Sequence, residues 1–290
     1  MSFRHLVQQL TPLMYKKLFF SLALCLALAS CGGGGASDIK PQITAIKVAS
    51  LQYGRSATIY FGGADLRTTM QVDTGGACTS PSFASTSTPE LAVLNCKVAQ
   101  VGDFVLSIKS AQGDAVYSTT LTVLKPQVLL STGGSSITLE LDPASAPITV
   151  NNFLGYVNSG YYTKTLFHRV IAGFVVQAGG YTAGLVKKAG QGAPIVLETQ
   201  KDGPSNLRGT VAMARTSDPN SATSEFFVNL VDNKFLDFQS AASPGYAVFG
   251  KVTQGLDVID GIATQATGSL NGFSDVPLTD ITITLALQIQ

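Results

Sequence analysis

An arginine and a glutamine stand in an otherwise apolar stretch, residues 167–180, and are the side chains best suited to chemistry. Burying a guanidinium costs free energy unless nearby groups accept its hydrogen bonds. Side chains of a strand repeat every second residue, so we expect Arg169, Val175 and Gln177 to share one face of a bent extended segment that ends at Gly179-Gly180. An apolar floor carrying one permanent cation and one amide indicates a recognition groove, which we interpret as an active site.

Four blocks of sequence carry a family resemblance. Residues 167–180 read Phe-His-Arg-Val-Ile-Ala-Gly-Phe-Val-Val-Gln-Ala-Gly-Gly, and residues 208–215 read Arg-Gly-Thr-Val-Ala-Met-Ala-Arg. Residues 221–229 read Ser-Ala-Thr-Ser-Glu-Phe-Phe-Val-Asn and are followed by Phe-Leu-Asp at 235–237, and residues 246–259 begin Tyr-Ala-Val-Phe-Gly-Lys-Val. In this order the blocks resemble cyclophilins, the peptidyl-prolyl cis/trans isomerases, and most of all their bacterial secreted members. The resemblance runs from roughly Pro126 to the C-terminus.

The resemblance implies a role for each groove residue. Rotating an X-Pro bond breaks amide resonance, and the prolyl nitrogen of the twisted amide becomes able to accept a hydrogen bond. Arg169 is the implied catalytic residue, because a guanidinium stays charged and donates from a rigid fork. No nucleophile, metal or cofactor is implied. The implied substrate-binding residues are Phe174, Val175, Gln177, Ala214, Glu225, Phe227, Phe235, Leu236 and Tyr246.

Three residues depart from the pattern of the family. Phe235 stands where members often carry tryptophan, which speaks against tight cyclosporin binding, and Val175 replaces a more usual methionine. Glu225 occupies the place of a glutamine, and an ionised carboxylate offers acceptors only. We expect Glu225 either to pair with Arg169 or to repel peptide carbonyls, and charge-assisted hydrogen bonding favours the pairing.

Other interpretations of these residues remain open. Phe174, Phe227 and Leu236 are also ordinary core residue types. A Ser-His-Asp hydrolase would have to use His168, but the chain has no Gly-x-Ser-x-Gly elbow, so His168 is interpreted as structural. Arg215 is interpreted as a solvated charge at the rim of the groove. The alternative function is a non-catalytic module of the cell envelope that binds proline-containing peptides.

The N-terminus resembles a bacterial lipoprotein signal. Lys16 and Lys17 precede an apolar run, and Leu-Ala-Ser-Cys ends it at Cys31, the expected site of lipidation. Residues 32–38 have the composition of a flexible tether. Residues 1–31 hold three of the chain's 19 bases and none of its 18 acids, so the mature chain has 16 bases against 18 acids, about −2. This balance does not indicate nucleic-acid binding.

Residues 39–125 predict a β-sandwich that looks immunoglobulin-like. Short alternating runs at residues 104–108 and 120–123 flank the turn signal Gln112-Gly113-Asp114. Cys25 leaves with the signal peptide and Cys31 is expected to carry the lipid, so Cys78 and Cys96 remain as a pair. An exported protein meets an oxidising compartment, so we expect a disulfide between them.

Residues 126–290 predict a second domain of strands and two helices. Gly133-Gly134 separates two strands of a hairpin, and Ile137, Leu139 and Leu141 are expected to face the core. A helix is expected from Pro147 to about residue 157, a second helix after Gly255, and an alternating terminal strand at 281–287. By resemblance these elements form a closed β-barrel capped by helices.

Together these observations predict a mainly β protein with a sandwich followed by a cyclophilin-like barrel. We expect a monomeric peptidyl-prolyl isomerase that acts on proline-containing segments of exported proteins. It would be held on the bacterial envelope by a lipid on Cys31 and face the periplasm, with no nucleic-acid partner.

Overall fold

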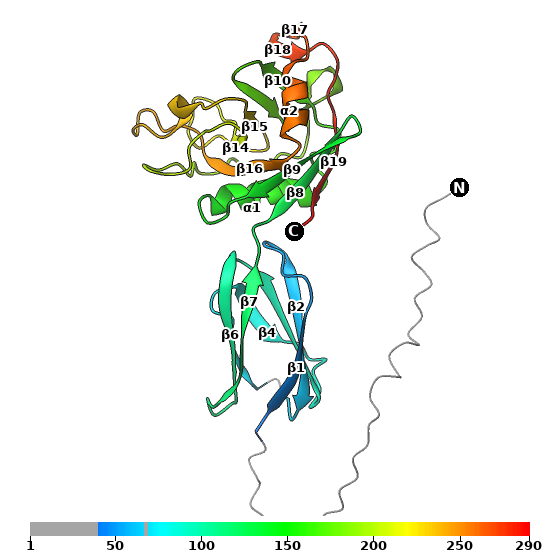
Figure 1. Ribbon diagram of the computed structural model, residues 1–290, viewed down its shortest axis with the longest axis vertical. Helices are drawn as coiled ribbons and strands as arrows, with labels where there is room; N and C mark the ends of the chain where they lie inside the picture. Colours follow the sequence, from blue (N-terminus) through cyan, green and yellow to red (C-terminus); the bar gives the residue numbers. More distant parts are fainter. Residues whose placement is uncertain (1–39, 67–68) are drawn as a thin grey trace, which may run out of the picture. The chain divides into compact units, whose positions relative to one another are not determined.

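The protein is mainly β, as predicted. A computed structural model describes residues 40–66 and 69–290 (Figure 1). The predicted signal peptide (1–31) with Cys31 and the tether (32–38) lie outside the described residues. The predicted boundary at 125/126 falls between two strands that belong to different sheets, β7 and β8.

The first seven strands form two antiparallel sheets. Their bounds are β1 (Gln42–Val48), β2 (Ser56–Ala64), β3 (Gln71–Asp73), β4 (Cys78–Phe83), β5 (Leu91–Val98), β6 (Gly102–Lys109) and β7 (Ala115–Val123). One sheet has the order β1-β2-β5-β4, and the other has the order β3-β6-β7. The predicted hairpin around residues 112–114 is confirmed as the β6–β7 connection.

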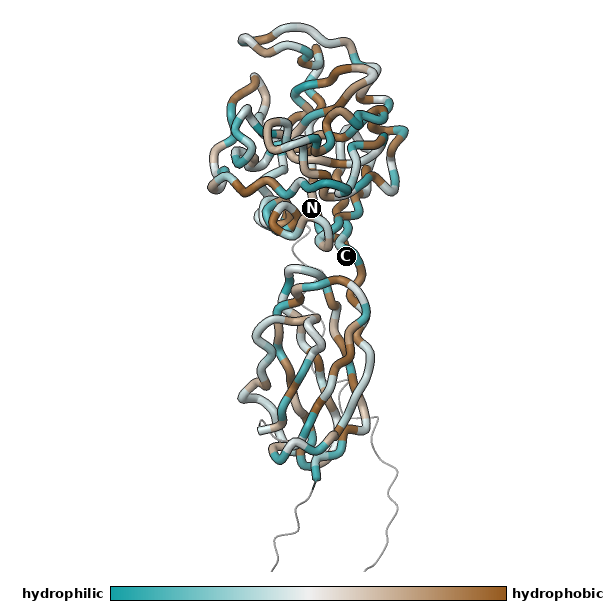
Figure 2. The backbone as a smooth tube through the Cα atoms, turned by 90° about the vertical axis from the view of Figure 1, so that its left-hand side faces the viewer, coloured by the Kyte–Doolittle hydropathy of each residue, from teal (hydrophilic) through white to brown (hydrophobic). Residues whose placement is uncertain are grey.

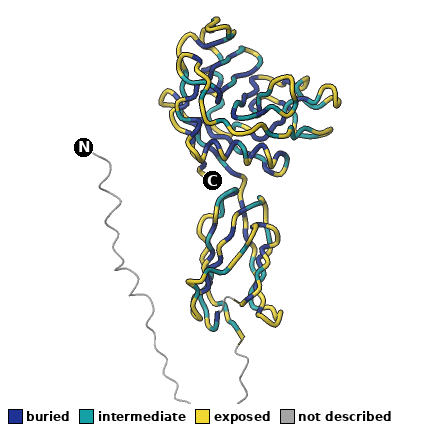
Figure 3. Tube along the Cα trace, turned by 180° about the vertical axis from the view of Figure 1, so that it is seen from behind, coloured by how far each residue is buried: buried dark blue, intermediate teal, exposed yellow. Residues whose placement is uncertain are grey.

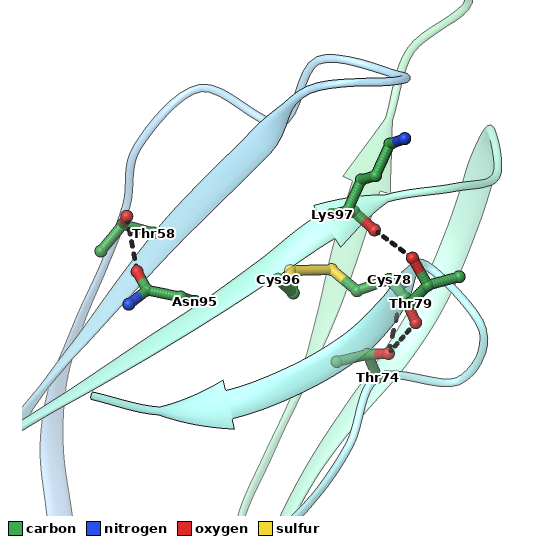
Figure 4. Close-up of a disulfide and its surroundings, with 7 residues drawn as sticks. All are labelled: Thr58, Thr74, Cys78, Thr79, Asn95, Cys96 and Lys97. Atoms are coloured by element: carbon green, nitrogen blue, oxygen red, sulfur yellow. Dashed lines mark hydrogen bonds between the residues drawn. A yellow bond between two sulfur atoms is a disulfide. The ribbon is translucent and has the colours of Figure 1, made fainter. Parts of the chain in front are cut away.

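Apolar side chains from both sheets share one core. Ile59 and Phe61 of β2 meet Leu106 and Ile108 of β6 there, and all four are buried. The structure also joins Cys78 of β4 to Cys96 of β5 (Figure 4). Two sheets around a common core agree with the predicted architecture, and the immunoglobulin-like class stays a prediction.

The remaining strands build one eight-stranded antiparallel sheet and two short hairpins. The sheet has the order β10-β11-β15-β14-β16-β9-β8-β19. Its strands are β8 (Gln127–Thr132), β9 (Ser135–Leu141), β10 (Phe167–Ile171), β11 (Val175–Ala178), β14 (Thr210–Met213), β15 (Phe226–Asn229), β16 (Val248–Gln254) and β19 (Ile283–Gln288). The short hairpins are β12 (Tyr181–Thr182) with β13 (Val186–Lys187), and β17 (Thr267–Leu270) with β18 (Phe273–Pro277).

The eight-stranded sheet curls into a half-barrel, whereas the sequence predicted a closed barrel. Its outer strands, β10 and β19, are not ladder partners. Where both strands begin, a bridge joins Leu166 to Thr282. Beside it Phe167 N donates to Ile281 O at 2.9 Å, Ile283 N donates to Thr165 O at 2.8 Å, and Lys164 N donates to Ile283 O at 2.8 Å. The two edges therefore meet over a short stretch, residues 164–167 against 281–283, instead of along a continuous ladder.

Two α-helices cover the sheet where the sequence predicted them. Helix α1 (Pro147–Asn158) packs against β19, and α2 (Leu256–Ala263) packs against β9. Hydrophobic segments (brown in Figure 2) recur along the strands, and buried segments (dark blue in Figure 3) concentrate in the sheet and in α1. Ile137, Leu139 and Leu141 are fully buried, which confirms the inward face predicted for that hairpin.

The N-terminus of α1 is capped from a distant loop. Its N-cap residue, Ala146, has no side-chain acceptor, so the first N–H groups of the helix need another partner. Glu198 supplies it by accepting from Ile148 N at 2.9 Å and from Thr149 N at 2.7 Å. This contact ties the loop after β13 to the helix.

Candidate active site

A row of register partners crosses five neighbouring strands and carries the predicted chemistry. Residues paired across antiparallel strands point to the same face of the sheet. The row consists of Arg169 on β10, Gln177 on β11, Phe227 on β15, Ala212 on β14 and Val248 on β16. Pairing therefore brings together residues that are up to 79 positions apart (Arg169 and Val248).

The other face of the same strands is turned into the core. Val170, Val176, Val228 and Val211 form a parallel row and are all buried in the main hydrophobic cluster. Strand alternation thus separates a core row from a row that faces outward. This confirms the expectation that Arg169, Val175 and Gln177 share one face.

The outward row borders a cavity of about 200 Å³. Val175 and Phe227 make its apolar base and belong to one buried cluster with Ala212 and Val248, and the ring of Phe227 meets that of Tyr246 edge-on at 5.6 Å. The residues that line the cavity are Arg169, Phe174, Val175, Gln177, Ala214, Arg215, Phe227, Leu236 and Tyr246. Of the predicted groove residues, only Glu225 and Phe235 are not in the lining.

A larger cavity of about 350 Å³ shares Tyr246 with this one but has a different character. Its lining is dominated by charged and polar side chains, which include Glu198, Lys201, Asp202, Lys234 and Asp237. An apolar ring such as that of proline gains nothing from such walls. The smaller cavity combines apolar walls with a cation, so we regard it as the functional site.

Arg169 enters the cavity with most of its donors uncommitted. Among the described residues its guanidinium makes one hydrogen bond, from Nη1 to Gln177 Oε1 at 3.3 Å. A guanidinium carries five N–H donors. The remaining donors are thus available to a ligand, next to apolar walls that weaken competition from water.

The acid at position 225 does not contact this arginine, and the predicted Arg169–Glu225 pair is wrong. Glu225 Oε2 instead accepts from Gln177 Nε2 at 2.8 Å and lies 3.2 Å from His168 Nε2. The amide of Gln177 therefore stands between the acid and the guanidinium. His168 is buried, and the centre of its ring lies 4.8 Å from that of Tyr181.

The charge state of Glu225 follows from these contacts. Burial alone would raise the pKa of its carboxyl. The hydrogen bond and charge of His168, the amide of Gln177 and the charge of Lys187 outweigh burial and hold the pKa below its usual value near 4.5. Glu225 is therefore ionised at neutral pH.

The second arginine at the site is anchored, and its interpretation as a solvated rim charge is wrong. Arg215 donates from Nε and Nη2 to Gly245 O at 3.1 and 2.9 Å, and from Nη1 to Thr216 O at 2.8 Å. Its guanidinium also lies 4.5 Å from the ring centre of Tyr246. Arg215 therefore binds backbone carbonyls with Nε, Nη1 and Nη2 and stabilises the loops that border the cavity.

Two other predicted residues have particular settings. Phe235 is 67% exposed and stacks on Phe174 with ring centres 5.8 Å apart, so it forms an outer rim instead of a wall. The N–H of Ala214 already donates to Glu225 O at 2.9 Å, which leaves its carbonyl oxygen for a peptide.

The sequence analysis missed a buried asparagine network that supports one wall. Asn206, Asn229 and Asn233 are almost fully buried. Asn229 links the other two, Asn233 Nδ2 donates to Phe174 O at 3.0 Å, and Asn206 Nδ2 donates to Leu236 O at 3.2 Å. Buried amides need such partners. The available signal was their place in or next to the family-like blocks: Asn206 precedes the block at 208–215, Asn229 ends the block at 221–229, and Asn233 precedes Phe-Leu-Asp.

Neither a metal centre nor a membrane span is found within residues 40–66 and 69–290. No cluster of three histidine, cysteine, aspartate or glutamate side chains in these ranges could hold a metal ion. None of the helices there has the length and hydrophobicity that a bilayer span requires.

Comparisons with known proteins agree on one family. The family model for cyclophilin type peptidyl-prolyl cis-trans isomerase/CLD matches residues 127–286, more than half of the chain. Peptidyl-prolyl cis-trans isomerase A of Dickeya dadantii is 46% identical over 179 residues, which cover 62% of this chain and 90% of that protein. An isomerase of Streptomyces antibioticus is 50% identical over 158 residues, which cover 54% of this chain and 94% of that protein.

Solved structures are also similar to this chain. Among them is a Cryptosporidium parvum cyclophilin type isomerase determined in the presence of the dipeptide Ala-Pro, with 24% sequence identity and a TM-score of 0.47. The match covers 57% of this chain and 99% of that one.

Proposed function

The chain belongs to the cyclophilin-type peptidyl-prolyl cis-trans isomerases, and from this we propose that it assists the folding of exported proteins with Arg169 as its catalytic residue. Peptidyl-prolyl isomerase activity follows from the family. The exported clients, the proline pocket and the part played by each residue are our proposals.

The proposed catalysis depends on how an amide changes when it rotates. Turning an X-Pro bond out of plane costs about 18–20 kcal/mol in resonance. The prolyl nitrogen then gains a lone pair that accepts a hydrogen bond, which the planar amide does not offer. A donor fixed beside that nitrogen binds the twisted state more strongly than the planar one, and this difference lowers the barrier.

One observation carries the proposal. Arg169 makes a single hydrogen bond within the described chain, at the border of an apolar cavity. Val175, Phe227 and Leu236 would hold the proline ring, and the free N–H groups of Arg169 would reach its nitrogen. The guanidinium acts as a hydrogen-bond donor from a rigid fork, so no acid–base step is required.

The cellular setting of the proposal comes from the N-terminus. The lipobox-like residues 28–31 and the glycine run after them favour a lipid anchor on Cys31 and a periplasmic location in a bacterium. Unfolded exported chains contain cis and trans X-Pro bonds that exchange in tens to hundreds of seconds. An anchored isomerase would shorten this step for its clients.

The test is isomerisation of a proline-containing tetrapeptide by the wild-type protein and by Arg169→Ala. We expect kcat/KM to fall by about 10²–10³-fold, the usual effect of removing one preorganised donor from a transition state. Arg208→Ala is the matched control, because Arg208 pairs with Asp260 outside the cavity lining.

The outcomes separate the enzyme from its alternative. A loss confined to Arg169→Ala supports the proposed mechanism. Equal and negligible rates in the wild type and Arg169→Ala would instead favour a module that binds proline segments without turning them over. Full activity of folded Arg169→Ala would overturn the role of Arg169.

A further inference from the structure

A chain of side chains runs behind the groove wall and ends at Arg169. His168 Nε2 lies 3.2 Å from Glu225 Oε2, the same oxygen accepts from Gln177 Nε2 at 2.8 Å, and Gln177 Oε1 accepts from Arg169 Nη1 at 3.3 Å. Glu225 itself is not part of the cavity lining. Glu225 contacts Gln177, the partner of Arg169, and not the cavity where a ligand would lie.

The carboxylate of Glu225 is held closely in its place. It lies against Gly180, where a Cβ atom would come within 2.5 Å of Glu225 Cδ. A side chain at position 180 would therefore have to displace the side chain of Glu225. The side chain of Glu225 is 23% exposed and that of His168 is 3% exposed, so water competes weakly for their hydrogen bond.

The chemical identity of these groups decides which way the Gln177 amide faces. An ionised carboxylate can only accept hydrogen bonds, so Gln177 must turn its NH₂ group toward Glu225. Its carbonyl oxygen is then forced toward Arg169. The opposite orientation would bring the NH₂ group against the guanidinium, donor against donor, and the carbonyl against the carboxylate.

We propose that Glu225 and His168 are positioning residues that orient the guanidinium of Arg169 through the amide of Gln177. His168 donates from Nε2 and holds the carboxylate, the carboxylate sets the amide, and the amide oxygen holds Nη1. The inference rests on the proposed role of Arg169.

The same arrangement assigns a polarity to substrate recognition. One N–H of the Gln177 NH₂ group is bound to Glu225, and the other has no partner in the described part of the chain. Gln177 therefore presents a donor to the groove, which suits a carbonyl oxygen of the bound peptide.

The decisive experiment is a double-mutant cycle on kcat and KM, measured with a proline-containing tetrapeptide. Glu225→Met keeps the length of the side chain but removes the acceptor. We expect kcat to fall about tenfold, as for the loss of one ordering hydrogen bond to a charged group, while KM stays within about twofold. In a Gln177→Ala background, Glu225→Met should have no further effect, because the intermediary is gone.

Matched variants isolate the cause. Glu140→Met is the control, since the Glu140 side chain is similarly exposed (26%) and also pairs with a cation, Lys251; its kcat should match the wild type. Glu225→Gln keeps an acceptor oxygen and should restore most of the activity. His168→Phe should lower kcat by less than Glu225→Met, because His168 Nδ1 has no partner to lose among the described residues.

Two results would overturn the proposal. One is a folded Glu225→Met enzyme with wild-type kcat, and the other is an equal proportional loss with and without Gln177, which a purely structural role of Glu225 would produce. If Arg169→Ala keeps full activity, the proposed role of Arg169 fails. If Arg169→Ala loses activity while folded Glu225→Met does not, only the inference about Glu225 fails.

A measurement on the wild-type protein covers the case in which Glu225→Met does not fold. The side-chain amide protons of Gln177 should have separate NMR signals, one of them protected from solvent exchange by Glu225. The exposed Gln112 provides the reference within the same spectrum. Gln177 signals that exchange as fast as those of Gln112 would overturn the proposal.

Discussion

Arg169 and Gln177 are register partners on neighbouring antiparallel strands, and Arg169 Nη1 lies 3.3 Å from Gln177 Oε1. This contact is the single hydrogen bond of the Arg169 guanidinium within the described residues. The orientation of the cation therefore depends on one amide, and that amide is bonded on its other side to Glu225.

Exchanging the acid and the amide tests this arrangement. Gln177→Glu places a second carboxylate where Gln177 Nε2 now lies 2.8 Å from Glu225 Oε2, and two carboxylates at such a distance repel each other. We expect kcat/KM to fall about tenfold, as for one lost charge-assisted hydrogen bond, and the melting temperature to fall at pH 7.

The double variant Gln177→Glu/Glu225→Gln should recover most of both losses, since one amide and one carboxylate again face each other across this contact. Steady-state kinetics and thermal unfolding are the measurements. No recovery in the double variant would contradict a direct Gln177–Glu225 hydrogen bond.

The ionised state of Glu225 predicts a pH dependence of stability. The pKa of Glu225 is lower in the folded protein than its usual value near 4.5. Its stabilising contribution is therefore complete above the unfolded pKa and is lost as the pH falls through the folded pKa. The ionisable groups that influence this carboxyl are those of His168, Lys187, Tyr161, Tyr162 and Tyr181.

We expect the wild type to exceed Glu225→Gln in unfolding free energy at pH 6–7, and the difference to shrink below about pH 4.5. Urea unfolding of both proteins between pH 7 and pH 3 measures this. Other acids with lowered pKa, such as Asp142 and Asp237, affect both proteins alike and cancel. A difference that stays constant over the range would contradict the assignment.

The Cys78–Cys96 pair should stabilise the first domain without contributing to catalysis. Closing a loop of 18 residues stabilises by about 3 kcal/mol in the chain-entropy model. No residue that lines the cavity around Arg169 comes from the strands that carry this pair. Cys78→Ser/Cys96→Ser should therefore lower the unfolding free energy of this domain and leave kcat/KM unchanged. Two thiols alkylated under non-reducing denaturing conditions would show that the bond is not formed.

Cys31, outside the described residues, should carry the lipid anchor. The lipobox-like Leu-Ala-Ser-Cys sequence at residues 28–31 is the basis. We expect the wild type in the membrane fraction and Cys31→Ser in the soluble fraction, with Cys25→Ser as the matched control that still reaches the membrane. Mass spectrometry of the mature N-terminus should find acylated Cys31. An unmodified N-terminus would contradict the anchor.

Local patterns in the sequence were enough for the elements, and the family resemblance named most of the cavity residues. Alternation at residues 137–141 and the Gly133-Gly134 turn predicted the β8–β9 hairpin, and the apolar spacing after Pro147 predicted α1. Arg169, Phe174, Gln177 and Phe227 were named from their motifs, and all four line one cavity. The hairpin and the helix depend on neighbours within a few residues, whose geometry the helical and strand repeats determine.

Only the tertiary structure decided which side chains meet. The partners of Glu225, the anchoring of Arg215 at Gly245 O, and the capping of α1 by Glu198 join residues that lie tens of positions apart. Such contacts depend on strand register and on burial, which a local pattern does not contain. From the sequence, charge attraction favoured an Arg169–Glu225 pair. In the folded protein Gln177 occupies the register position beside Arg169, and His168 is buried beside Glu225, so the acid bonds to these two instead.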